Sequence, residues 1–92
     1  MNVKSLMKDL GLYVDPNDVP EEMKHNVGRK LRYLNWEPKM GTIARDFTFT
    51  VREFQKDYRG ELCYRIYCDG FDDRVGRPLN PARESFEFVR VH

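Results

Sequence analysis

The sequence predicts an α+β domain in which two N-terminal helices pack on a three-stranded antiparallel β-sheet. Apolar residues recur every three to four positions in the first third of the chain and every second position in the later part. The chain has 92 residues, enough for one compact core, and 40% of them are hydrophobic, as in folded proteins. We therefore expect a single domain over residues 1–92, with the helices covering one face of the sheet.

The first helix is predicted over Asn2–Leu10, because its apolar residues recur at the spacing of one helix face. These residues are Val3, Leu6, Met7 and Leu10. Gly11 follows at the position where helices commonly end in a left-handed residue. The turn-forming sequence Asp15-Pro16-Asn17 comes next, so a short linker should place the two predicted helices side by side.

The second helix is predicted over Asp18–Trp36, and the rest of the predicted fold is organised around it. Asp18 can accept the first free backbone N–H groups, and Glu21, three residues later, completes a capping-box pattern. Pro20 falls in the first turn, where its missing N–H costs nothing. At about 100° per residue, four apolar side chains share one arc and are predicted to be buried against the sheet. They are Met23, Val27, Leu31 and Leu34.

The opposite face of this helix is basic. The window Lys24–Arg32 holds four basic residues and one histidine but no acidic residue. Basic side chains suit the C-terminal half of a helix, which explains this face as a solvated surface. An exposed aromatic side chain among arginines is also typical of binding patches, and both explanations stay open. The candidate contact residues on the helix are Lys24, His25, Arg29, Arg32 and Tyr33.

Two strands follow the change of hydrophobic period. Phe47, Phe49 and Val51 alternate with polar residues, and a second alternating segment covers Leu62–Cys68. The polar segment Lys56–Glu61 lies between them and contains a glycine, so we predict a β-hairpin. This hairpin adds two candidate contact residues, Arg52 and Arg59.

The C-terminal part is predicted to be a loop and a third strand. Asp69–Ala82 holds two glycines, two prolines and three aspartates, a composition typical of loops. Glu84–Val91 is predicted as the third strand, through Phe86 and Phe88. The loop aspartates, Asp69, Asp72 and Asp73, lack the spacing of a calcium-binding loop, so we assign them to turn capping and solvation.

Nothing in the sequence indicates catalysis, a metal or a cofactor. Cys63 and Cys68 are five positions apart in one predicted strand, so they point to opposite faces and are expected to be free thiols. Two cysteines and two histidines do not supply a zinc-site spacing. His25 is the one internal histidine and lies among positive charges that would not orient it as a base. We expect a non-enzymatic protein.

The charge balance limits what the whole molecule can bind. Sixteen basic and fifteen acidic residues give a formal net charge of +1, so any nucleic-acid binding has to be local. No apolar stretch has the length of a membrane span or of a signal peptide, and we expect a cytoplasmic protein that does not contact membranes.

The segment Asn26–Pro38 resembles part of a known family. It is similar to the winged-helix-like C-terminal segment of virulence-associated-E-type phage and plasmid primase-helicases. In that family a helix ending in Leu-Gly precedes a second helix that contains Gly-Arg, Leu-Arg and Trp-Glu. The matching residues here are Leu10 and Gly11, then Gly28, Arg29, Leu31, Arg32, Trp36 and Glu37, while Asn35 stands where the family has glycine. The resemblance covers about residues 3–40.

The resemblance implies an origin in a phage or mobile element and a winged-helix-like arrangement, with the hairpin as the wing. The leading functional prediction is binding of nucleic acid, DNA rather than RNA. The contacts would come from Lys24, His25, Arg29, Arg32, Tyr33, Arg52 and Arg59. The alternative is a phage-encoded inhibitor that binds a host defence or replication complex without catalysis, and the near-neutral net charge favours this alternative.

Overall fold

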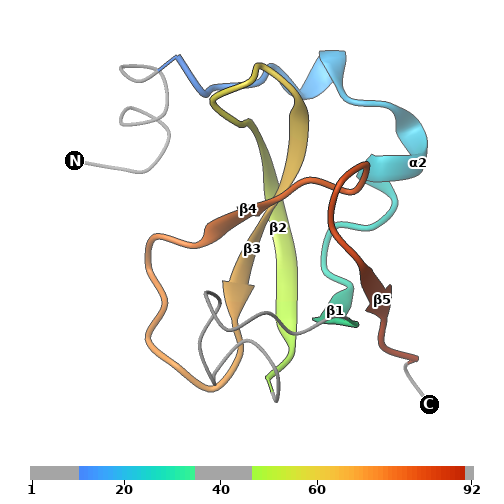
Figure 1. The fold of residues 1–92 in the computed structure, drawn as a ribbon, viewed down its shortest axis with the longest axis vertical. Coiled ribbons are helices and arrows are strands. Elements are labelled where there is room, and N and C mark those ends of the chain that lie inside the picture. The colour runs from blue at the N-terminus through green and yellow to red at the C-terminus, as the bar shows by residue number, and fades with distance from the viewer. Residues whose placement is uncertain (1–10, 35–46, 91–92) are drawn as a thin grey trace.

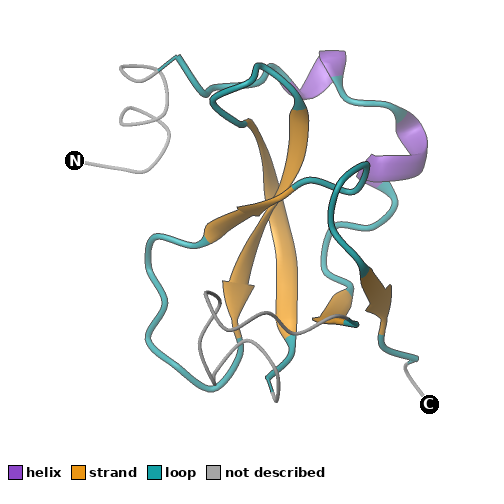
Figure 2. Cartoon of the chain, viewed as in Figure 1, coloured by secondary structure: helices purple, strands orange, loops and turns teal. Residues whose placement is uncertain are grey.

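The computed structural model describes residues 11–34 and 47–90, and within them the protein is mostly β. Figures 1 and 2 show one antiparallel sheet with a short helical segment beside it. The helical elements are the 3-10 helix η1 (Pro16–Asp18) and the α-helix α2 (Glu21–Lys24). The five strands are β1 (Lys30–Tyr33), β2 (Phe49–Lys56), β3 (Leu62–Cys68), β4 (Arg77–Leu79) and β5 (Phe86–Phe88). The predicted α+β fold, two helices on three strands, is therefore wrong.

The long helix predicted over Asp18–Trp36 is replaced by a four-residue helix and a strand. Gly28 adopts a left-handed backbone conformation, with φ at 89°, and its N–H donates to the Val51 carbonyl at 2.7 Å. The Val51 N–H in turn donates to the Arg29 carbonyl at 3.0 Å, so the chain enters the sheet directly after Gly28. A left-handed residue interrupts a helix, and sheet pairing takes over from there. Residues 35 and 36 lie outside the described residues.

The helix-start signals precede two short helical elements rather than one long helix. The Asp15 carboxylate caps η1 by accepting the Asn17 backbone N–H at 2.9 Å, and the residue that precedes α2 is Pro20. The capping-box pattern that begins at Asp18 therefore starts no long helix. The first predicted helix, Asn2–Leu10, lies outside the described residues.

The predicted buried arc breaks up because β1 has a period of two. Leu31 is fully buried, as predicted, and Met23 packs partly buried against the core. Val27 and Leu34 were predicted to be buried, but 47% and 55% of their surfaces are exposed. In β1 the residues alternate between exposed and buried, which no arc of a helix can reproduce.

The predicted hairpin is confirmed as β2 and β3, with its turn inside Lys56–Glu61. A β-bulge between Val51 and Glu53 shifts the register of this pair. The predicted third strand exists as β5, but it pairs with β1 rather than with the hairpin. The predicted loop Asp69–Ala82 contains a short strand, β4, which pairs with β3.

The sheet curls so that its ends face each other. The strand order is β4-β3-β2-β1-β5, so β2 and β1 separate β3 from β5. Even so, the Tyr64 ring of β3 lies 6.3 Å from the rings of both Phe86 and Phe88 of β5. The Arg77 guanidinium of β4 lies 5.5 Å from the ring centre of Tyr33 in β1. These contacts close the sheet around one apolar core: Leu31, Tyr33, Phe49, Val51, Tyr64, Ile66 and Leu79.

The strand β3 is buried on both faces. Tyr64 and Ile66 face the core, so Cys63, Arg65 and Tyr67 lie on the opposite face, where all three are also buried. The segment between β3 and β4 covers that face. The Arg65 guanidinium donates to the Val75 carbonyl and to the Gln55 side chain, and to the Tyr67 hydroxyl at 3.3 Å.

Candidate functional site

The seven predicted contact residues do not share one face, because the long helix that would have aligned five of them is absent. Lys24 lies in α2, 3.6 Å from the Glu21 carboxylate, and His25 follows it, exposed. Arg29 precedes β1 and donates to the Asn26 side chain at 2.9 Å. Its guanidinium also lies 4.1 Å from the ring centre of Phe88.

Arg32 and Tyr33 are adjacent in β1 and therefore point to opposite faces of the sheet. The Arg32 Nε lies 2.6 Å from the Glu87 Oε1 on the outside. Tyr33 lies in the core with 7% of its surface exposed, in an edge-to-face contact with Phe49. Burial raises the pKa of Tyr33 to about 12, and among the described residues its hydroxyl has no hydrogen-bond partner.

The two hairpin arginines lie apart from each other. Arg52 is exposed on β2, with its guanidinium 5.1 Å from the ring centre of Tyr67. Arg59 lies in the turn between β2 and β3, 3.7 Å from the Asp57 carboxylate. Arg59 therefore lies next to Asp57 and Tyr58, which are not among the predicted contact residues.

The aspartates that follow β3 bind side chains and backbone N–H groups of neighbouring segments and do not form a metal-binding cluster. Asp69 accepts hydrogen bonds from the Thr48 and Thr50 hydroxyls at 2.7 and 2.6 Å and pairs with Lys30 at 3.0 Å. Asp73 accepts the backbone N–H groups of Cys68 and Gly76, which is turn capping. In the part of the chain that the structure describes, no group of three or more His, Cys, Asp or Glu residues could hold a metal ion.

These bonds predict a pH dependence. Burial would raise the pKa of Asp69, but hydrogen bonds from Thr50, Thr48 and Lys30 outweigh it and lower that pKa below its ordinary value. A carboxyl group with a lower pKa in the folded chain stabilises the fold above its unfolded pKa of about 3.9, and this contribution is lost as the pH falls through the folded value. We expect the urea concentration at the unfolding midpoint to decrease as the pH is lowered from about 6 to about 3. The decrease should be smaller in Asp69→Asn than in the wild-type chain.

The matched control for this experiment is Asp72→Asn, because the Asp72 carboxylate contacts the exposed Arg74 at 3.1 Å and lies in the same segment. This variant should keep the full pH dependence of the wild-type chain. Equal slopes in Asp69→Asn and Asp72→Asn would contradict a stabilising role for the Asp69 carboxylate.

Among the large hydrophobic side chains of the described residues, Tyr58 is the most exposed. It lies in the turn between β2 and β3 with 84% of its surface exposed. The Arg59 guanidinium lies 4.6 Å from its ring centre. Asp57 fixes the turn, because its carboxylate accepts the backbone N–H groups of Arg59 at 2.9 Å and of Glu61 at 3.0 Å. We call residues 57–61 the hairpin tip.

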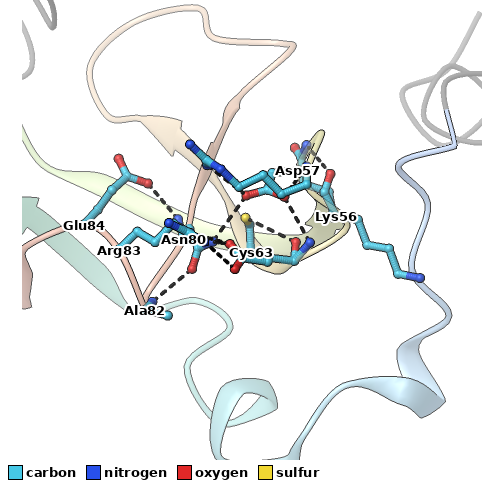
Figure 3. Close-up of polar contacts among 10 residues, drawn as sticks. Lys56, Asp57, Cys63, Asn80, Ala82, Arg83 and Glu84 are labelled. Carbon is cyan, nitrogen blue, oxygen red and sulfur yellow. Dashed lines mark hydrogen bonds and ion pairs between the residues drawn. The ribbon is translucent and has the colours of Figure 1, made fainter.

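A buried asparagine ties the hairpin tip to the next turn of the sheet. The Asn80 side-chain amide donates to the Asp57 carboxylate at 3.2 Å and to the Glu61 carboxylate at 2.9 Å. Its carbonyl oxygen accepts the Ala82 N–H at 3.0 Å. Figure 3 shows Asn80 between Asp57 and Ala82. The backbone that carries Tyr58 is thus held at both ends of its turn and from the side.

A second contact between the two turns is an ion pair. The Arg83 guanidinium donates to both oxygens of the Glu61 carboxylate, at 2.5 and 2.9 Å. The hydrogen bonds from Arg83 lower the pKa of Glu61, so this carboxylate is charged at neutral pH. A two-point contact of this kind fixes the angle between the partners as well as their distance.

The cysteine beneath this network is not a nucleophile. Cys63 is buried, and burial, together with the charges of Asp57, Glu84 and Glu61, raises the pKa of its thiol to about 12. A thiol with this pKa carries no useful fraction of thiolate at neutral pH. The polar groups around the hairpin tip hold the turn in place.

The comparisons with known proteins add no relative. No protein-family model matches the sequence, and neither the curated proteins nor the solved structures contain a match. No helix in residues 11–34 and 47–90 has both the length and the apolar character needed to cross a membrane.

Sequence reasoning missed Tyr58, although one signal was available. A tyrosine in the middle of a polar hairpin turn has no core to enter, so Tyr58 had to be exposed once Lys56–Glu61 was recognised as a turn. The supporting bonds from Asn80 had no such signal. They join residues 23 and 19 positions apart along the chain, which only the folded sheet brings together.

Proposed function

We propose that this chain is a non-catalytic protein-binding module that contacts its partner with the hairpin tip, above all with Tyr58. The observation that supports it is an 84% exposed tyrosine on a turn that hydrogen bonds already hold in place. An ordered backbone loses little entropy on binding, and a tyrosine adds a large contact area with only two side-chain torsions. Tyrosine and arginine, the pair found here, are enriched among interface hot spots.

Charge favours a protein partner over nucleic acid. Binding to phosphates needs basic side chains that are available to them. Around the hairpin tip, Arg59 and Arg83 are paired with the carboxylates of Asp57 and Glu61. Elsewhere Lys30 and Arg32 are paired with Asp69 and Glu87. A protein partner can present charges that complement this mixture of basic and acidic side chains. A phosphate backbone would be repelled by the acidic ones.

The test is the substitution Tyr58→Ala. The variant should fold with a free energy of unfolding within about 0.5 kcal/mol of wild type, because the side chain is exposed. It should lose at least about tenfold in affinity, the scale of a hot-spot residue. The measurement is capture of a partner from nuclease-treated host lysate by the immobilised chain, followed by a dissociation constant for the captured protein with each variant.

The matched control is Val27→Ser, which changes another exposed hydrophobic residue outside the hairpin tip. This variant should bind as the wild-type chain does. Equal binding by wild type and Tyr58→Ala would remove the hairpin tip from the interface. Capture of a partner from untreated lysate that is lost when the lysate is treated with nuclease would favour nucleic-acid binding instead. A host defence or replication complex as the partner stays a prediction.

A further inference from the structure

The two edges of the sheet differ in what they offer to another strand. An edge strand presents backbone N–H and C=O groups that can pair with an incoming chain. At one edge stands β4, a three-residue strand whose middle residue is Pro78. Proline has no N–H and takes edge positions where that group would point away from the sheet. The β4 edge therefore has no donor at its centre.

The other edge, β5, has these groups in place. The Leu34 N–H donates to the Ser85 carbonyl at 3.1 Å, and the Val89 N–H donates to the Lys30 carbonyl at 2.8 Å. Hydrogen-bonded pairs alternate along an antiparallel ladder, so Glu87 faces its partner Arg32. The N–H and C=O groups of Phe86 and Phe88 therefore point away from β1. Figure 1 shows β5 on the right-hand side of the molecule, below α2, with no other labelled strand to its right.

The side chains of β5 give this edge a chemical pattern. The ring centres of Phe86 and Phe88 lie 5.5 Å apart. Both side chains are partly buried and pack against the core on the inner face. Glu87 points to the outer face, where its carboxylate lies 2.6 Å from the Arg32 Nε of β1. On the outer face, β1 therefore carries a positive charge at Arg32 and β5 carries a negative charge at Glu87. A third strand would continue this alternation with a positive charge.

We propose that the β5 edge binds an extended peptide segment of a partner protein, which adds to the sheet as a sixth strand. Its backbone pairs with the outward groups of Phe86 and Phe88. Its sequence reads apolar-basic-apolar: the basic side chain lies beside Glu87, and the apolar side chains lie beside the two phenylalanines. Backbone pairing supplies affinity in this mode, and alternate side chains supply specificity. Opposite charges on facing strands stabilise such a pair.

This edge is separate from the hairpin tip. Figure 1 places the turn between β2 and β3 near the top of the view and β5 low on the right. A loss of binding at one surface therefore leaves the other intact, and the two proposals can be tested on the same preparation.

The experiment measures binding of fluorescently labelled synthetic peptides by anisotropy. One peptide carries Val-Lys-Val at its centre, and the second carries Val-Glu-Val. Wild type should bind the lysine peptide at least about tenfold more tightly, because the second peptide places two carboxylates opposite each other. The double variant Arg32→Glu, Glu87→Lys keeps an ion pair at the same place with its direction reversed. It should prefer the glutamate peptide by a similar factor.

Two controls make the result decisive. Methylating the backbone nitrogen that pairs with the edge should abolish binding of the lysine peptide, because β-pairing needs that N–H. Tyr58→Ala should bind the lysine peptide as wild type does. Equal binding of both peptides by wild type, or an unchanged preference in a double variant with a wild-type melting curve, would overturn the proposal. Binding that survives methylation would do the same.

Discussion

Replacing Leu31 with alanine should lower the free energy of unfolding by about 2–5 kcal/mol, because a fully buried leucine loses its packing and leaves a cavity. Leu31 lies at the centre of the curled sheet, paired on one side with Phe49 of β2 and on the other with Phe88 of β5. The strands on both sides keep the cavity from collapsing, which favours the upper part of that range. Urea unfolding at neutral pH measures the change.

The matched control is Leu34→Ala. Leu34 lies three residues further along with 55% of its surface exposed, so its truncation should change the free energy of unfolding by less than about 0.5 kcal/mol. The pair separates the strand from the helix that the sequence suggests, since one helix face would bury both residues. Similar losses from the two variants would contradict the strand β1.

Gly76→Ala should be almost as damaging, for a backbone reason. Gly76 has φ at 73°, where an L-residue is strained by roughly 1–2 kcal/mol. A Cβ there would also lie 2.9 Å from the Ile66 carbonyl oxygen and 3.0 Å from the Tyr67 ring. The backbone atom cannot move aside, so overpacking adds about 1–3 kcal/mol. We expect a loss of about 2–5 kcal/mol, measured by urea unfolding.

Gly70→Ala measures the backbone strain alone, so its difference from Gly76→Ala isolates the overpacking. Gly70 precedes Gly76 between the same two strands and has φ at 81°, but a Cβ there would meet nothing within 4 Å. It should cost only the strain of roughly 1–2 kcal/mol. A Gly76→Ala variant no less stable than Gly70→Ala would mean that this segment does not pack on β3 at Ile66 and Tyr67.

Local sequence patterns predicted the hairpin well and the first half of the described chain poorly. The alternation in β2 and β3 and the polar turn between them are both local, and they were sufficient. The segment Lys30–Tyr33 is only four residues long, so an apolar pair at Leu31 and Leu34 fits a helix as readily as Leu31 and Tyr33 fit a strand. The decision comes from Gly28 and from pairing with β2 and β5, which are remote in sequence.

The candidate site shows the same limit. Arg59 was named as a contact residue and does lie at the hairpin tip, because the turn itself was predictable. Tyr33 was placed on an exposed helix face and lies in the core, since a strand turns it to the opposite side from Arg32. The network around Asn80 joins two turns that no local pattern relates.

The pairing of β1 with β5 also determines when the protein can fold. Arg32 and Glu87, which face each other across these strands, are 55 positions apart in the chain. During synthesis β1 and β2 are made before β5, so the side of β1 that pairs with β5 has no partner strand until residues 86–88 have been made. Closing so large a loop costs conformational entropy before the contacts between β1 and β5 form. We therefore expect folding to be slow and to finish only after β5 has been made. A chain stopped before Phe86 should leave Leu31 without one of its two neighbouring strands and should be a substrate for proteases rather than a smaller version of the same domain.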